Sequence, residues 1–87
     1  METIAGAGNT EVPAYLVLRK LGFEVMARDQ GETAEQWIAT KSDLRLVASS
    51  PLELLGLSLM RMERGVNWKA TDEEITTFLQ SFYPGRK

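Results

Sequence analysis

The sequence contains neither histidine nor cysteine. Without histidine, it lacks the side chain most used for proton transfer near neutral pH and the commonest metal ligand. Without cysteine, it lacks thiolate nucleophiles, disulfide bonds and the usual ligands of structural zinc. Because most catalytic and metal-binding constellations need one of these residues, we expect no enzyme activity, no cofactor and no metal site.

Long runs of like charge and long apolar runs are also missing. Ten basic and twelve acidic residues give a formal net charge of −2, and their interspersion argues against strong attraction to nucleic acid or an anionic membrane. The longest apolar-rich stretch, residues 52–62, is interrupted by polar residues and is too short to span a bilayer. No charged segment followed by an apolar run opens the chain, so we expect a cytoplasmic protein without a membrane partner.

What is present is the composition of a folded domain. A chain of 87 residues is long enough for one domain and too short for two. Its 44% hydrophobic and 25% charged residues are typical of globular proteins and not of disordered ones. We expect a single domain over residues 9–83, with a flexible N-terminal tail at 1–8 and a C-terminal tail at 84–87.

Apolar periodicity predicts three helices. The first, over residues 9–22, has a capping residue at its start and glycine at its end. The second, over residues 50–65, is apolar around most of its circumference, so we expect a central helix that is buried on more than one side. The third begins with a capping box at 71–74. Its apolar stripe consists of Ile75, Phe78, Leu79 and Phe82.

Alternation of apolar and polar residues predicts three strands. The short link Ser42-Asp43 favours a hairpin in which Ala39 faces Leu46 and Ile38 faces Val47. The element order α-β-β-β-α-α then predicts an α+β fold: a three-stranded antiparallel meander with helices packed on one face. The predicted strands are 23–28, 36–41 and 44–48.

The second face of this sheet is the leading candidate for a functional surface. If the helices cover the side that carries Ala39 and Leu46, the opposite side presents an apolar centre with a rim of mixed charge, which is the anatomy of an interface. Scattered apolar residues on an ordinary sheet surface, or a helix covering this face, remain the alternatives. Trp68, in the connector before the last helix, is a further candidate anchor. The candidate interface residues are Met26, Arg28, Ile38, Arg45, Val47 and Trp68.

The leading hypothesis is therefore a non-catalytic interaction module that binds another protein or itself through the open sheet face. One alternative is a small-ligand domain with a pocket between the leucine-rich helix and the sheet, opened by Gly56. Glycine inside a helix costs about 1 kcal/mol relative to alanine, and close helix packing would explain it equally well. A minimal enzyme that uses carboxylates is a third hypothesis, although no pair of acidic residues stands out.

Over the middle of the chain, the element order resembles that of double-stranded-RNA-binding domains. Those domains place lysines at the start of the helix after the third strand, where they meet phosphates. Here the corresponding residues are Ser50-Pro51-Leu52-Glu53, with a carboxylate where cations are needed. The loop at 29–35 is acidic and lacks the Gly-Pro-x-His feature of that family. We therefore expect no nucleic-acid partner.

Overall fold

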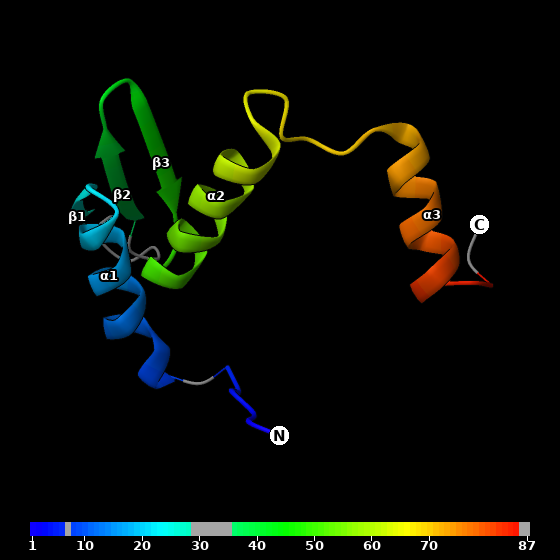
Figure 1. The fold of residues 1–87 in the computed structure, drawn as a ribbon, viewed down its shortest axis with the longest axis horizontal. Coiled ribbons are helices and arrows are strands. Elements are labelled where there is room, and N and C mark those ends of the chain that lie inside the picture. The colour runs from blue at the N-terminus through cyan, green and yellow to red at the C-terminus, as the bar shows by residue number, and fades with distance from the viewer. Residues whose placement is uncertain (7, 29–35, 86–87) are drawn as a thin grey trace.

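The computed structural model describes residues 1–6, 8–28 and 36–85. Its elements confirm the α+β class and the order α-β-β-β-α-α (Figure 1). The loop expected at 29–35 lies outside the described residues. In chain order the elements are a short 3-10 helix η1 (Gly8–Thr10), α1 (Glu11–Lys20), β1 (Glu24–Arg28), β2 (Gln36–Lys41), β3 (Leu44–Ala48), α2 (Pro51–Arg64) and α3 (Asp72–Phe82).

The three strands form one antiparallel sheet in the order β1-β2-β3, with β2 in the centre. The predicted hairpin register is confirmed, since Ala39 pairs with Leu46 and Ile38 pairs with Val47. In the turn between β2 and β3, Ser42 has a φ of 52°. This left-handed conformation costs a residue other than glycine about 1–2 kcal/mol, so the hairpin forms although its turn sequence is not optimal.

The core lies between the sheet and two helices, α1 and α2, which lie side by side on one face. This is the face that carries Ala39 and Leu46, which the sequence had left open. Trp37 and Leu44 are partly buried against the same cluster. The buried cluster consists of Leu18, Phe23, Ala39, Leu46 and Leu54.

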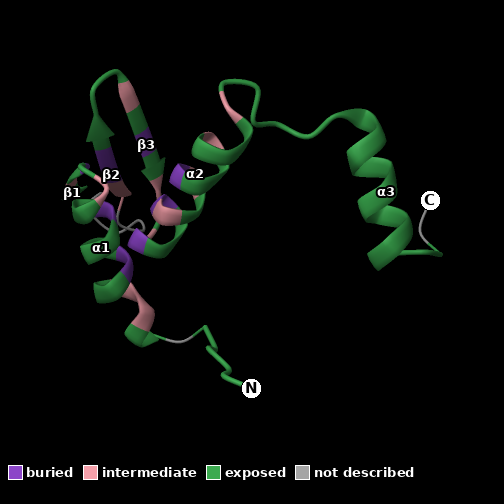
Figure 2. Cartoon of the chain, viewed as in Figure 1, coloured by how far each residue is buried: buried purple, intermediate pink, exposed green. Residues whose placement is uncertain are grey.

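Helix α2 is buried on one side only, so the expectation of a helix buried on more than one side is wrong. Its inward residues, among them Leu54 and Ser58, are inaccessible to solvent, while Leu52 and Leu59 on the outward side are exposed. A helix that is apolar all round needs a second layer to cover its outer side. Among the described residues no third helix supplies that layer (Figure 2).

Helix α3 is the reason that the second layer is missing. It stands away from the sheet and from α1 at the end of an extended connector (Figure 1), and all of its residues are exposed (Figure 2). The radius of gyration is 15.8 Å, whereas a compact chain of this length has about 12 Å. The molecule therefore consists of a packed body, η1 to α2, and a helix that the body does not cover.

The strained turn gives a prediction for stability. Replacing Ser42 with glycine, which adopts positive φ freely, should raise the free energy of unfolding by about 0.5–1 kcal/mol. Urea denaturation would measure the change. The matched control is Asp43→Gly: among the described residues other than glycine, only Ser42 has positive φ, so this second substitution should destabilise the hairpin. A Ser42→Gly variant that is less stable than the parent would contradict the assignment.

Candidate functional site

The open face of the sheet carries three of the predicted interface residues in one row. Met26 pairs with Ile38, and Ile38 pairs with Val47. Met26 and Val47 are 58% and 43% exposed, but Ile38 between them is only 2% exposed. The expectation that Ile38 is presented at the surface is therefore wrong, although Thr40, two residues further on the same strand and face, is exposed. The apolar centre of this face is closed, and its two exposed residues lie on the edge strands.

The other predicted interface residues separate into two groups. Arg45, Val47 and Trp68 line one small cavity beside β3, whereas Arg28 lies on the opposite edge strand, β1. The cavity has a volume of about 200 Å³, and ligand pockets usually measure about 300–1,000 Å³. It lies between α2 and the sheet, where a ligand pocket was expected, and Gly56 does not line it.

Gly56 also lacks the close packing that was its other explanation. A Cβ atom added there would meet no atom within 4 Å. The residue lies on the outward side of α2, one turn from Leu52 and from Leu59, which are both exposed. Nothing in the described part of this chain therefore accounts for a glycine at this position.

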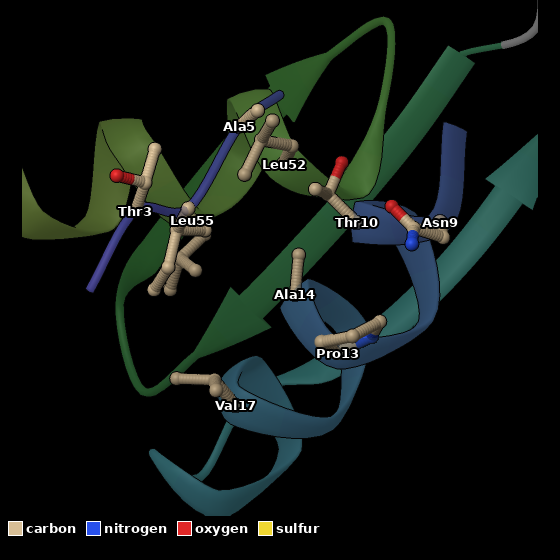
Figure 3. Close-up of a pocket in the computed structure, with 10 residues that line it drawn as sticks. Thr3, Ala5, Asn9, Thr10, Pro13, Ala14, Val17, Leu52 and Leu55 are labelled. Atoms are coloured by element: carbon tan, nitrogen blue, oxygen red, sulfur yellow. The ribbon is translucent and has the colours of Figure 1, made fainter. Parts of the chain in front are cut away.

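A larger groove lies between α1 and α2 on the side away from the sheet (Figure 3). Its volume is about 480 Å³. Pro13 and Val17 line it from α1, and Leu52 and Leu55 line it from α2. No charged side chain is among the described residues that line it. The groove is therefore suited to an apolar segment and offers no partner for an ionic ligand.

The most exposed apolar surface is the stripe on α3. The spacing of its residues is i, i+3, i+4 and i+7, so all four lie on one side of the helix. The rings of Phe78 and Phe82 lie 5.0 Å apart between centroids. The exposed fractions are 46% for Ile75, 55% for Phe78, 45% for Leu79 and 68% for Phe82. The sequence identified this stripe but not its exposure, because periodicity does not tell whether the covering surface belongs to the same molecule.

Arg64, near the end of α2, bonds to the connector and to the first turn of α3. The Arg64 guanidinium donates through Nε to the carbonyl of Trp68 at 2.8 Å and through Nη2 to Glu74 Oε1 at 2.7 Å. The same Glu74 oxygen accepts from the backbone N–H of Thr71 at 2.9 Å, as part of a capping box. We call this set of bonds the Arg64 clamp. It ties the connector and the first turn of α3 to the end of α2.

Among the described residues, two carboxyl groups have a shifted pKa, and helix capping explains both shifts. The backbone N–H of Thr71, followed by Arg64, lowers the pKa of Glu74. The backbone N–H and hydroxyl of Ser49 lower the pKa of Glu53 at the start of α2. Both groups are therefore ionised at neutral pH, and each accepts hydrogen bonds at the start of its own helix. The Glu53 carboxylate also places negative charge where a phosphate-binding helix would need positive charge.

The described residues contain neither a cluster of metal-binding side chains nor a membrane-spanning helix. Among these residues, no three acidic side chains come close enough together to hold a metal ion. No described helix has the length and apolar character needed to cross a membrane. Comparison with protein-family models, curated proteins and solved structures finds no significant match. Inference about function therefore rests on the surfaces described above.

The burial of Ile38 gives a prediction that separates core from surface on the open sheet face. Ile38→Glu buries a charge and should unfold the protein or lower its free energy of unfolding by more than about 3 kcal/mol. Val47→Glu, directly opposite on an exposed position, should change it by less than about 1 kcal/mol. Thermal denaturation followed by circular dichroism would measure both. Equal effects of the two substitutions would contradict the assignment of Ile38 to the core.

The Arg64 clamp gives a prediction for the titration of Glu74. Arg64→Met should raise the pKa of Glu74 towards its ordinary value but leave it lowered, because the Thr71 N–H is the larger cause. The pKa of Glu74 is lower in the folded chain than in the unfolded chain. Ionised Glu74 therefore stabilises the fold at any pH above the ordinary glutamate pKa of about 4.3, and this stabilisation is lost as the pH falls through the pKa of Glu74 in the folded chain. Carboxyl chemical shifts from NMR would follow the titration, with Glu53 as the internal control. An unchanged Glu74 pKa would contradict the clamp.

Proposed function

We propose that this protein is a non-catalytic protein–protein interaction module and that the apolar stripe of α3 is its principal binding surface. The observation that supports the proposal is the exposure of all four stripe residues on a helix outside the packed body. A stripe at i, i+3, i+4 and i+7 is the pattern by which amphipathic helices bind apolar grooves in partner proteins. The function is thus the presentation of a helix.

The energetics of α3 support the same conclusion. A helix of 11 residues is marginally stable in water when nothing packs against it, since isolated helices need about 12–15 residues or more. Its capping box and the Arg64 clamp stabilise the first turn only. Burial of a large apolar side chain contributes about 1.5–3 kcal/mol, so a partner that covers the stripe would supply the stabilisation that the chain does not provide.

The open sheet face is assigned a secondary part in this proposal. Met26 and Val47 are exposed at its two edges, and Arg28 and Arg45 would set the register of a partner there. Trp68 extends this surface beyond β3, since it shares a cavity with Arg45 and Val47. This surface is smaller than the α3 stripe because Ile38, at its centre, is buried.

A protein partner is favoured over a small ligand, nucleic acid or a carboxylate-based reaction. The cavity between α2 and the sheet is small, and the larger groove lacks charged groups. The net charge of −2 and the Glu53 carboxylate at the start of α2 disfavour phosphate binding. The two carboxyl groups with a shifted pKa have it lowered, which does not suit a general acid at neutral pH.

The proposal is tested by placing a charge on each side of α3. Phe78→Glu should weaken binding of the chain to any protein molecule, its own copies included, at least about tenfold. Thr77→Glu adds the same charge next to it on the polar side of α3 and should leave binding unchanged. Chemical crosslinking in the native cell extract would measure the yield of each crosslinked species. Circular dichroism would verify that each variant is folded.

The result that contradicts the proposal is equally specific. If the Phe78→Glu chain forms every crosslink that the parent chain forms, and with the same yield, α3 is not the binding surface. Because every residue of α3 is exposed, the substitution removes no contact of the packed body. Loss of binding can therefore be attributed to the stripe itself.

A further inference from the structure

Resting on the proposed function, we infer that the partner of the α3 stripe is a second copy of this chain. In this arrangement, α3 of each copy packs on the outward side of α1 and α2 of the other. The two contacts are equivalent and related by twofold symmetry, as in dimers that exchange a helix. The exchange gives both unpartnered apolar surfaces of the chain a cover.

The receiving surface is the outward side of the two packed helices, which we call the outer face. It combines the groove between α1 and α2 (Figure 3) with exposed apolar side chains next to it. The N-terminal segment of the same chain borders the groove through Thr3 and Ala5 (Figure 3), whereas Leu16, Leu52 and Leu59 beside it are exposed. Its apolar residues are Val12, Leu16 and Val17 on α1, and Leu52, Leu55, Leu59 and Met60 on α2.

The accessible surface of the chain is larger than that of a compact monomer of the same mass. The accessible surface is 7261 Å², whereas a compact monomer of 9.7 kDa exposes about 5,100 Å². The excess is about 2,100 Å² per chain, or about 4,200 Å² for two chains. Obligate homodimers bury about 2,000–5,000 Å² in total. This excess includes the surface of the extended N-terminal segment and the connector, and the α3 stripe and the outer face contribute the part of it that the dimer would bury.

Gly56 supports docking of a helix on the outer face. It lies between Leu52 and Leu59 on this face, where no side chain of its own molecule comes within 4 Å of an added Cβ. A glycine inside a helix costs about 1 kcal/mol relative to alanine. Absence of a side chain lets a second backbone approach closely, as in small-residue helix contacts. The α3 of a second copy would use this approach.

The Arg64 clamp favours the outer face of another copy over that of the same chain. By bonding Trp68 and Glu74, Arg64 directs the connector and α3 away from the body (Figure 1). With these bonds in place, α3 lies away from the outer face of its own chain (Figure 1). Docking on a second copy leaves every bond of the clamp intact.

The charges at the helix ends also complement one another. Helix α3 begins with Asp72 and Glu73, and α1 ends with Arg19 and Lys20. An antiparallel arrangement of α3 on α1 of the second copy brings the acidic start of one helix to the basic end of the other. The helix dipoles are then antiparallel as well, which is the favourable orientation.

The first test is the solution mass of the full chain by light scattering over a range of concentrations. The parent chain and Thr77→Glu should have about twice the mass of 9.7 kDa. Phe78→Glu on α3 and Leu59→Glu on the outer face should each have the monomer mass with an unchanged circular-dichroism spectrum, because both positions are exposed. A parent chain that stays monomeric overturns the inference.

The second test distinguishes exchange from other dimers. A chain with Phe78→Glu keeps an intact outer face, and a chain with Leu59→Glu keeps an intact α3. In an equimolar mixture of the two monomeric variants at high concentration, one of the two contacts is restored, so a heterodimer should form. A mixture that stays monomeric overturns the exchange, since a contact between two α3 helices or two outer faces cannot be rescued in this way.

These outcomes separate this inference from the proposed function. A monomeric parent chain whose crosslinks to a different protein are lost in Phe78→Glu would overturn the second copy as partner but leave the interaction module intact. A dimer that persists in Phe78→Glu would overturn both, because self-association would then not use α3. Only a dimer broken by both single substitutions and restored by their mixture supports the exchange.

Discussion

The packing of two helices on one face of a three-stranded sheet determines the rest of this structure. Leu18 of α1 and Leu54 of α2 are both inaccessible to solvent and belong to one cluster with Ala39 of the central strand. Three strands offer a face about as wide as two helices, since strands lie about 4.8 Å apart and packed helices about 8–10 Å apart. When α1 and α2 occupy it, α3 has no place on that face. The layer of two helices therefore has an outer face that nothing in the packed body covers, and α3 lies outside the packed body.

The fold of the body could be predicted from sequence because its signals are local. Alternation over 36–41 and 44–48, together with a two-residue link, determines a register in which Ala39 meets Leu46. The cap at Ser50, whose Oγ accepts from the Glu53 N–H, and the capping box at Thr71 mark where α2 and α3 begin. Each of these features depends on residues that are close in sequence, so no knowledge of the distant packing is needed.

The surfaces could be predicted only in part, because exposure depends on what covers a residue. Alternation defined the two faces of the sheet but not which of them the helices cover, and Ile38 was expected at the surface and is buried. Helix α2 was expected to be buried on more than one side, yet Leu52 and Leu59 are exposed, because a second apolar stripe on a helix indicates a contact without indicating the partner. The Arg64 clamp joins residues of α2, the connector and α3 through one guanidinium. No short sequence motif predicts these bonds.

The boundary at Gly65, where α2 ends with a φ of 81°, has a consequence for the dynamics of a single copy. Helices α1 and α2 and the central strand β2 share one buried cluster, so the amides in their middle exchange with solvent only when the body opens as a whole. Helix α3 shares none of that burial, and its amides exchange through local openings that leave the body folded. A free chain thus contains two regions of very different protection, separated by a few residues of connector. Any molecule that covers α3 would extend the protected region to Phe82 and make the two open together.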